Sequence, residues 1–341
     1  MKISWQKNFW ALILAPLLIS SGCMKQDASG KKENTVWIYT SMYKDTITDL
    51  TPRLEKAFPG VKFNWYQAGS EDIATKVNAE MINGKIQADL LISSDRFWYE
   101  DLAQQGHLQS YSPLKTDKIR PELKNEKSLY TTLSIPVMVL CYNNEAIPAD
   151  QAPSSFKDLA LPKWKAKFST GSPLSSGTNF TTMAVLQSLY GWDYFESLKK
   201  NETISEGGNS AVIRRIQSKE RPIGWVLLEN ILRFQGKDER LKIIYPKDVI
   251  ITHTNVLAIP SERLNLELVK KVADFLYTDE GQEAMTRSYM YSPFENFKAP
   301  EGAPPLSELL DRSFKWSGDF LTKMTRERLQ LKEKLTEIMF R

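Results

Sequence analysis

Short apolar runs alternate with helix-like segments along the first third of this chain. Residues 36–39 form the first run, and apolar side chains then recur at spacings of three and four from Ile47 to Phe58. Such spacing is typical of a helix that buries one face, whereas a short apolar run bounded by turn residues is typical of a buried strand. The runs cover residues 36–39, 61–66 and 88–92, and the helical segments that follow them cover residues 47–58, 71–83 and 95–105. This alternation predicts a parallel sheet with helices on its faces.

A second strand–helix series lies between two long extended runs. The extended runs cover residues 129–142 and 249–259. Between and after them, the pattern predicts strands at 168–169, 223–228 and 243–245 and helices at 179–190, 211–218, 264–276 and 318–340. The sequence therefore predicts an α/β protein of two lobes joined by two extended crossings. We assign residues 35–138 and 256–341 to a discontinuous first lobe and residues 139–255 to the second lobe.

The N-terminal residues have the pattern of a secretion signal. Two lysines precede an apolar run at residues 9–19, and the small residues Ser20-Ser21-Gly22 then lead to Cys23. A charged head, a short apolar stretch and a small-residue cleavage site predict that residues 1–22 are a signal peptide. The apolar run is shorter than the roughly 20 residues of a membrane-spanning helix.

A cysteine at the cleavage point resembles the lipobox of bacterial lipoproteins, in which the cysteine receives lipid and becomes the mature N-terminus. We therefore expect a lipid anchor at Cys23, followed by a flexible polar tether, over residues 23–34. Ser20 stands where lipoboxes usually carry Leu, Val or Ile, so an ordinary signal peptide is the alternative. The expected location is the periplasm or cell envelope, with the chain held at a membrane by the lipid.

Composition narrows the function classes. The formal net charge is +4, and Lys2 and Lys7 carry two of these charges, which leaves +4 − 2 = +2 for the residues after the predicted signal peptide. This weak and mixed charge does not suggest nucleic-acid binding. With two histidines and two cysteines in 341 residues, a zinc site or a histidine-dependent triad is not expected. Cys141 lies in an apolar run, so we expect a buried, unreactive thiol.

Small hydroxyl residues open a helix at nearly every predicted strand exit. In open α/β sheets, ligands bind beyond the carboxyl ends of the strands, so these exits form the candidate site. The exits hold Thr40–Tyr43, Ala68–Glu71, Ser93–Asp95, Gly171–Asn179, Glu206–Ser210 and Glu229-Asn230. Each exit alone is explained well enough as a helix cap. Together, several helix N-termini around one cleft would form a cradle for an anion without any lysine or arginine.

Motifs at these exits resemble those of the solute-binding proteins of bacterial ABC importers. The motifs are Ile38-Tyr39-Thr40-Ser41-Met42-Tyr43-Lys44, Gln67-Ala68-Gly69-Ser70-Glu71, Ala88-Asp89-Leu90-Leu91, Ser94-Asp95-Arg96-Phe97-Trp98-Tyr99, Pro173–Thr178, Gly207–Val212 and Tyr291–Leu306. The most similar branch contains ferric-iron, phosphonate and hexose-phosphate binders. The resemblance covers about residues 35–341. It implies the two-lobed type II periplasmic-binding-protein fold, whose lobes close on a ligand like a hinge.

The resemblance also implies the partners of the protein. A solute-binding protein captures a small solute and delivers it to an ABC permease in the inner membrane. We expect a monomer with no nucleic-acid partner, no cofactor and no protein-bound metal. A sensory binding protein that signals to a membrane partner would use the same fold.

The residue types at the strand exits indicate the class of ligand. Ferric-binding members of the resembled family place two adjacent tyrosines after a second-lobe strand, and that place here holds Glu229-Asn230. They also often place a histidine in the first loop, where this chain has Tyr43. Hydroxyl-rich loops suit a phosphate or phosphonate head better, so we expect a small anionic solute such as a phosphonate, a phosphorylated sugar or a similar organophosphate. Ferric iron or an iron complex is the alternative ligand.

The candidate ligand-binding residues come from both lobes. They are Ser41, Tyr43, Ser70, Ser94, Asp95, Ser175, Ser176, Gly177, Thr178, Asn209, Ser210 and Glu229. Asp95 and Glu229 would face the other end of the ligand and accept hydrogen bonds from sugar hydroxyls or pair with an amine. For these two, a helix cap or a surface ion pair is the alternative. Tyr43 would stack on the ligand or pack in the core.

A secreted hydrolase is the competing function class. The sequence has no Gly-x-Ser-x-Gly elbow and no phosphate-binding Gly-Lys-Ser/Thr loop. We therefore expect a binding protein with no catalytic residues, and not an enzyme.

Overall fold

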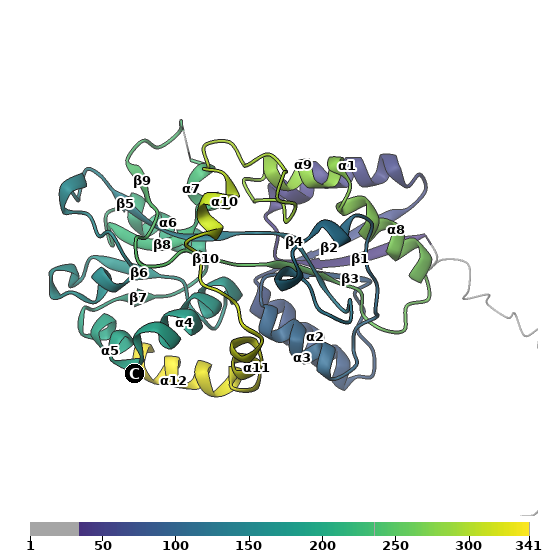
Figure 1. The fold of residues 1–341 in the computed structure, drawn as a ribbon, viewed down its shortest axis with the longest axis horizontal. Helices are drawn as coiled ribbons and strands as arrows, with labels where there is room; N and C mark the ends of the chain where they lie inside the picture. Colours follow the sequence, from purple (N-terminus) through teal and green to yellow (C-terminus); the bar gives the residue numbers. More distant parts are fainter. Residues whose placement is uncertain (1–33, 235, 341) are drawn as a thin grey trace, which may run out of the picture.

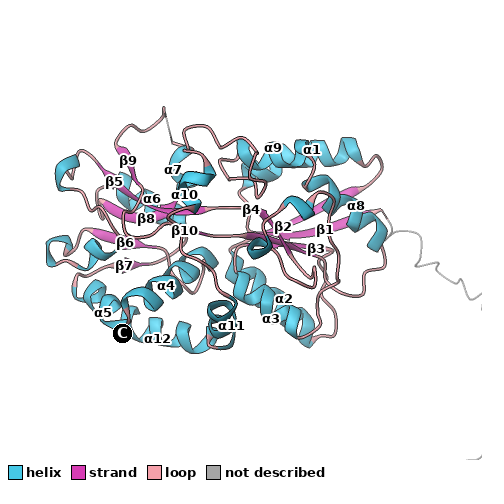
Figure 2. Ribbon diagram, viewed as in Figure 1, coloured by secondary structure: helices cyan, strands magenta, loops and turns pink. Residues whose placement is uncertain are grey.

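Two α/β lobes lie side by side in the protein, each built on one sheet with helices on its faces (Figure 1, Figure 2). The computed structural model describes residues 34–234 and 236–340. The predicted fold class is confirmed. The predicted signal peptide, Cys23 and nearly all of the predicted tether lie outside the described residues.

The first lobe carries a five-stranded sheet in the order β2-β1-β3-β11-β4. Strand β1 pairs in parallel with β2 and β3, and β11 runs antiparallel to β3 and β4. The strands are β1 (Thr35–Thr40), β2 (Lys62–Gln67), β3 (Leu90–Ser93), β4 (Thr131–Ser134) and β11 (Asn255–Ala258). The helices are α1 (Lys44–Ala57), α2 (Ser70–Ile82), α3 (Arg96–Gln104), α8 (Leu266–Leu276) and α9 (Asp279–Arg287). Because β1, β2 and β3 are parallel, α1, α2 and α3 all begin at one edge of this sheet.

The second lobe carries a six-stranded sheet in the order β10-β5-β8-β6-β7, with β9 paired to β5. Strand β6 pairs in parallel with β7 and β8, and β5 runs antiparallel to β8. The strands are β5 (Val137–Asn143), β6 (Phe168–Thr170), β7 (Ile204–Ser205), β8 (Ile223–Leu227), β9 (Leu241–Ile244) and β10 (Ile251–Thr252). The helices are α4 (Gly177–Tyr190), α5 (Trp192–Lys200), α6 (Asn209–Gln217) and α7 (Leu228–Leu232).

Burial on both faces explains why the central strands are continuous apolar runs. In β1, Val36 and Ile38 pack with Leu50 of α1 on one face of the sheet. Tyr39 points to the other face and packs with Val77 of α2. The two faces of the first-lobe sheet therefore hold two separate hydrophobic clusters, and the strand positions between them are fixed from both sides.

Two extended crossings join the lobes, as predicted. One passes from β4 to β5 through Ile135-Pro136, and the other passes from β10 to β11 through His253-Thr254. The backbone N–H of His253 donates to the carbonyl oxygen of Pro136 at 2.8 Å, so the two crossings lie against each other. The predicted extended runs at 129–142 and 249–259 contain them.

Two of the C-terminal helices pack on the second lobe. They are α10 (Leu306–Leu310) and α12 (Arg328–Phe340), whereas α11 (Gly318–Arg326), which lies between them in sequence, packs against α3 of the first lobe. Leu331 and Leu335 of α12 belong to the core cluster of the second lobe, and Leu306 of α10 packs with another cluster of that lobe. The predicted division, which gave 256–341 to the first lobe, is therefore wrong for α10 and α12. Helix α12 lies beside α5 (Figure 1).

Helix prediction was weakest where elements are short. The apolar pattern predicts one helix over 318–340, but the structure has two helices there, separated at Glu327. Helix α11 lies against α3, and α12 lies against α5. Helices α5, α7, α9 and α10 were not predicted. Length alone does not explain the missed α5 and α9, because α3 and α6 also have nine residues and were predicted.

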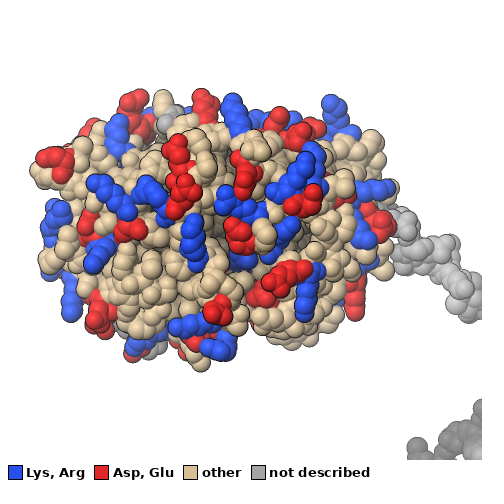
Figure 3. Space-filling view, viewed as in Figure 1, with Lys and Arg blue, Asp and Glu red and all other residues tan. Residues whose placement is uncertain are grey.

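No helix within residues 34–234 and 236–340 is long and apolar enough to cross a membrane. Positive and negative side chains alternate over the face drawn in Figure 3, as the small net charge suggests. Cys141 is fully buried and free, as predicted.

Candidate functional site

A cavity of about 210 Å³ lies between the lobes at the exits of their strands. This volume is below the roughly 300–1,000 Å³ of pockets for drug-sized ligands, so the cavity suits a small solute. Ten of the twelve predicted residues line it: Ser41, Tyr43, Ser70, Ser94, Ser175, Ser176, Thr178, Asn209, Ser210 and Glu229. The structure thus brings together residues that lie up to 188 positions apart in the sequence (229 − 41 = 188). Their role in binding remains a prediction.

The first lobe contributes serines from three neighbouring strand exits. Ser41 follows β1, Ser70 is the first residue of α2, and Ser94 follows β3. The Ser94 hydroxyl lies 3.4 Å from the Ser70 oxygen, to which it donates. Because β1, β2 and β3 are parallel neighbours, their exits meet at one edge and these hydroxyls share one wall of the cavity.

The second lobe contributes the starts of α4 and α6. Ser176 is the N-cap of α4, and its oxygen accepts from the Asn179 N–H at 3.4 Å. The Ser176 and Thr178 hydroxyls lie 3.1 Å apart, and Asn209 Nδ2 donates to Thr178 Oγ1 at 3.2 Å. Ser210, the second residue of α6, is exposed at the cavity rim. The two helix starts are therefore tied together by their own polar side chains.

The side chain of Asn179 supports the starts of α4 and α6 through hydrogen bonds. Its side chain is fully buried, and its Nδ2 donates to Ser176 Oγ at 3.0 Å and to Asn209 Oδ1 at 3.2 Å. Its Oδ1 accepts from Trp225 Nε1 at 2.9 Å. Asn179 was not among the predicted site residues, since its position in the sequence indicates the first turn of a helix, and its partners Asn209 and Trp225 lie on other elements.

Helix N-termini and hydroxyls, without cations, define the chemistry of the cavity. Helices α2, α4 and α6 begin at residues 70, 177 and 209, next to or within the lining. The first turns of helices present free N–H groups and a partial positive charge. Among the described residues, no Lys or Arg lines the cavity. The arrangement can therefore hold a small anion through amide and hydroxyl donors.

The lobes touch each other at the cavity wall. The Gly177 N–H in the second lobe donates to Ser70 Oγ in the first lobe at 2.8 Å. A β-carbon on Gly177 would meet Ser70 Oγ at 2.8 Å and Asp95 Cβ at 2.9 Å, so this approach requires glycine. Gly177, a predicted ligand-binding residue, is not part of the lining, and its N–H is already bound across the lobe boundary.

Tyr43 forms a second contact between the lobes. Its hydroxyl donates to Asn230 Oδ1 at 2.8 Å, and the Arg233 guanidinium lies 4.2 Å from its ring centroid. Arg233 also pairs with Asp45 of α1. Burial, and to a lesser degree the charge of Glu229, raise the pKa of the Tyr43 phenol. Tyr43 is therefore a neutral hydrogen-bond donor that borders the cavity.

Glu229 brings a carboxyl group to the cavity without a charged partner. The residue is 1 % exposed, and it lies directly after β8 at the start of α7. Burial raises the pKa of its carboxyl to about 8. Near neutral pH this carboxyl therefore carries a proton in most molecules, and it can donate one hydrogen bond and accept another.

Asp95 does not face the cavity, and the prediction that it meets the ligand is corrected. Its side chain is fully buried, caps α3 by accepting from the Trp98 N–H at 3.2 Å, and accepts from Arg328 Nε at 2.9 Å. Arg328 lies in α12, which the sequence places more than 200 residues away. The alternative interpretation of Asp95 as a cap and ion-pair partner is the correct one.

Two other lining residues, Asn255 and Met290, lie outside the strand exits that the sequence indicated. Asn255 begins β11 beside the hinge, and its Nδ2 donates to Ser134 Oγ at 2.9 Å. Met290 follows α9, a helix that the pattern did not predict. Both residues reach the cavity only because the chain crosses back between lobes, which local pattern does not reveal.

The part of the chain that the structure describes offers no metal centre. Within residues 34–234 and 236–340, no group of three or more His, Cys, Asp or Glu side chains is placed to hold a metal ion. His253 is buried in the hinge, with Nε2 3.2 Å from Thr182 Oγ1, and burial lowers its pKa to about 3.

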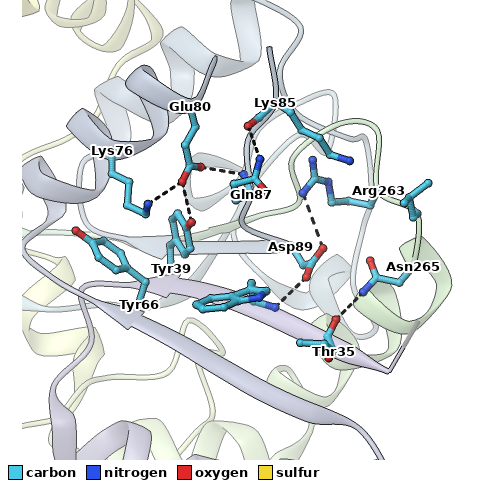
Figure 4. Close-up of a pocket in the computed structure, with 12 residues that line it drawn as sticks. Thr35, Tyr39, Tyr66, Lys76, Glu80, Lys85, Gln87, Asp89, Arg263 and Asn265 are labelled. Carbon is cyan, nitrogen blue, oxygen red and sulfur yellow. Dashed lines mark hydrogen bonds and ion pairs between the residues drawn. The ribbon is translucent and has the colours of Figure 1, made fainter. Parts of the chain in front are cut away.

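A second and larger groove, of about 620 Å³, lies on the first lobe along one face of β1 (Figure 4). Its polar groups are already paired with one another. Glu80 accepts from the Tyr39 hydroxyl and pairs with Lys76, each at 2.8 Å, and Asp89 accepts from the Trp37 N–H at 2.8 Å. Since ligands in open α/β sheets bind at the carboxyl ends of strands, the inter-lobe cavity is the stronger candidate.

Comparison with known proteins identifies the family. Residues 85–318 match the family model of the bacterial extracellular solute-binding proteins. The chain belongs to this family. The family comprises the solute-binding components of ABC importers, which bind a small solute outside the cytoplasm. The predicted resemblance to these solute-binding proteins is therefore confirmed.

Solved structures share the fold over nearly the whole chain. AfuA from Actinobacillus pleuropneumoniae, a periplasmic binding protein with fructose-6-phosphate bound, has a TM-score of 0.78 at 22% identity, over 89% of this chain and 98% of that chain. Iron-bound HitA from Pseudomonas aeruginosa has a TM-score of 0.75 at 19% identity, over 88% of this chain and 99% of that chain. An uncharacterized protein of Haemophilus influenzae is 22% identical over 290 residues, 81% of this chain and 82% of that protein. The solute-binding protein therefore has the type II periplasmic-binding fold.

Proposed function

We propose that this solute-binding protein captures a small organic anion with a phosphate or phosphonate head in the inter-lobe cavity and delivers it to an ABC permease. A phosphorylated sugar, a phosphonate or a similar organophosphate fits this description. The observation that carries the proposal is the meeting of three helix starts and their hydroxyls around a cavity that, among the described residues, no Lys or Arg lines.

The binding free energy available from such a site is sufficient to capture a small anion. A hydrogen bond to a charged acceptor is worth roughly 1.5–3 kcal/mol. Three or four such bonds supply about −8 kcal/mol, which corresponds to a micromolar dissociation constant before ordering costs are subtracted. Ser70, Ser176 and Thr178 lie among the groups that would supply these bonds.

Glu229 supports a ligand that carries hydroxyls as well as a charged head. An ionised carboxylate in the same cavity would repel an anion, whereas a protonated Glu229 does not. Its carboxyl lies on the second-lobe wall after β8, while the helix starts of α4 and α6 follow other strands of that lobe. A sugar hydroxyl beside Glu229 would find both a donor and an acceptor there. AfuA, whose structure contains fructose-6-phosphate, gives a precedent for a sugar phosphate within this fold.

Direct ferric-iron binding is the weaker alternative. Iron in this fold has a precedent in HitA. In the present protein, Tyr43 is the tyrosine that lines the cavity, its hydroxyl is bound to Asn230, and burial raises its pKa. A raised pKa disfavours the phenolate that ferric iron would need.

The proposed location is the cell envelope, with lipid at Cys23 as the anchor. The N-terminal pattern of charge, apolar run, small residues and cysteine supports it. Metabolic labelling with a fatty-acid analogue tests this part of the proposal. Label should enter the wild-type chain and be absent from Cys23→Ser.

The ligand class is tested by thermal stability and native mass spectrometry. Inorganic phosphate, methylphosphonate and fructose-6-phosphate are added to the purified protein, with fructose as the matched control and ferric citrate as the competing ligand. A ligand present at a hundredfold excess over its dissociation constant stabilises the folded state by about 2.7 kcal/mol. We expect stabilisation by at least one phosphorus compound and none by fructose.

Two outcomes would contradict the proposal. One is an unchanged melting temperature with all three phosphorus compounds. The other is stabilisation by ferric citrate alone, together with a visible phenolate–iron absorption band. Native mass spectrometry of protein purified without refolding gives an independent answer, because a retained ligand reveals its own mass.

A further inference from the structure

Four charged side chains meet across the lobe boundary, directly behind the cavity wall. Glu71 of α2 and Asp95 before α3 belong to the first lobe, and Arg328 and Lys332 belong to α12. Arg328 Nη2 lies 2.9 Å from Glu71 Oε2, Arg328 Nε lies 2.9 Å from Asp95 Oδ2, and Lys332 also pairs with Glu71. None of the four side chains is more than 13 % exposed.

The two cations are fixed to the second lobe. Leu331, between them in sequence, and Leu335 pack into the core of that lobe. Lys332 Nζ lies 4.7 Å and the Arg328 guanidinium 5.7 Å from the ring centroid of Phe180 in α4. If the lobes separate, the cations would therefore move away with α4 and α12, and the four-charge cluster would be broken.

Each of the two acidic residues directly follows a serine that lines the cavity. Glu71 follows Ser70, and Asp95 follows Ser94, and both serines line the cavity. The same closure brings Ser70 Oγ within 2.8 Å of the Gly177 N–H. The cluster therefore acts on the position of two lining hydroxyls and not only on the distance between lobes.

We propose that Arg328 and Lys332 are positioning residues that hold the lobes closed and set Ser70 and Ser94 against the bound solute. This inference rests on the proposed function for its ligand, but not for the closure itself. Taking charges out of water offsets much of their attraction, so such a cluster biases an equilibrium without locking it. A ligand binds the closed state, and its apparent affinity is reduced by whatever fraction of molecules is open.

The primary test removes both signs of charge at once. Arg328→Met alone leaves Asp95 buried without its ion-pair partner, which can unfold the protein. The quadruple variant Glu71→Gln, Asp95→Asn, Arg328→Met and Lys332→Met leaves no unpaired charge, and asparagine still caps α3. Small-angle X-ray scattering without added ligand measures the radius of gyration, and we expect it to shift to a larger value in this variant.

The second measurement is the affinity for inorganic phosphate by calorimetry. We expect the quadruple variant to bind at least about tenfold more weakly, equal to 1.4 kcal/mol, while its far-UV circular dichroism stays that of the wild type. The matched control is Arg326→Met with Glu327→Gln, an exposed pair at 3.0 Å beside the start of α12. It should keep both the wild-type radius and the wild-type affinity.

The outcomes separate this inference from the proposed function. An unchanged radius of gyration in the folded quadruple variant overturns the positioning role, whatever the ligand is. An equal shift in the control also overturns it. If phosphate fails to bind the wild type, the anion proposal loses support, and the scattering result still decides the role of the cluster.

Discussion

Burial without a charged partner decides the protonation of Glu229. In the unfolded chain its carboxyl ionises near the ordinary value of 4.5, whereas in the folded protein the pKa rises to about 8. The folded state thus binds this proton more tightly between those values, and the contribution of Glu229 to the free energy of unfolding falls as pH rises from about 4.5 to 8. Glu229→Gln keeps the size of the side chain and removes the titration. We expect its urea-unfolding free energy to fall less than that of the wild type between pH 5 and pH 8.

The exposed Glu220, in the same lobe, provides the control for this prediction. Glu220→Gln should keep the wild-type dependence of stability on pH. Parallel curves for wild type and Glu229→Gln across this range would show that the folded protein does not hold the proton on Glu229.

Single residues were predictable where chemistry and strand exits coincide. Ser41, Ser70 and Ser94 could be chosen because each follows an apolar run at an edge where ligands bind. Asp95 could not be assigned correctly, because its partner Arg328 lies in the last helix. Asn179 was missed for a similar reason, since three of its four hydrogen-bonded neighbours (Thr170, Asn209 and Trp225) come from elements that only the folded chain brings together.

The start of α4 combines a structural role with a proposed binding role. Ser176 caps the helix, and Thr178 faces the cavity beside it. Loss of an N-cap costs about 1 kcal/mol of stability. We expect the double variant Ser176→Ala, Thr178→Ala to lose about that much stability in urea, while its affinity for phosphate, measured by calorimetry, falls at least about tenfold.

Thr278 is the matched capping residue at the start of α9, where its oxygen accepts from the Gly281 N–H at 3.3 Å. Thr278→Ala should lose comparable stability and keep the wild-type affinity. If both variants lose stability and neither loses affinity, the α4 residues serve only as caps.

Elements were predictable where an apolar pattern could be recognised in the sequence. Helices α1 to α4, α6 and α8 were located in this way, and every strand of the two sheets except the two-residue β7 overlaps a predicted strand or extended run. The break at Glu327 could not be seen, since the apolar positions of α11 and α12 join into one helical pattern although the two helices pack against different lobes. Tertiary contacts, and not local propensity, set that boundary.

Closure of the whole molecule depends on the absence of a side chain at residue 177. A methyl group there would meet Ser70 Oγ and Asp95 Cβ of the opposite lobe at 2.8 and 2.9 Å. We expect Gly177→Ala to fold normally, to show a larger radius of gyration by scattering, and to bind phosphate more weakly than the wild type.

Gly318 gives a close control, because it is also the first residue of a helix and a β-carbon there would meet no atom within 4 Å. Gly318→Ala should match the wild type in radius and affinity. A Gly177→Ala protein with the wild-type radius would mean that the lobes accommodate the methyl group, and that the contact at Gly177 does not limit closure.

The two-lobed plan could be predicted from the sequence, but its last boundary could not. Two extended runs at 129–142 and 249–259 marked the crossings, and both lie where the lobes join. The packing of α10 and α12 on the second lobe could not be predicted, because an amphipathic pattern indicates that one face of a helix is buried but not which surface buries it.

The position of Thr35 has a consequence for how the receptor presents its opening. The described chain enters the first sheet at Thr35, at the amino end of β1, and Ser41 borders the cavity beyond the other end of the same strand. A strand of this length spans about 20 Å at 3.3 Å a residue. An attachment to the cell surface through the residues before Thr35 would hold the receptor at the edge of the first lobe that lies away from the cavity. The opening of the cavity would then stay free to admit solute and to meet the transporter.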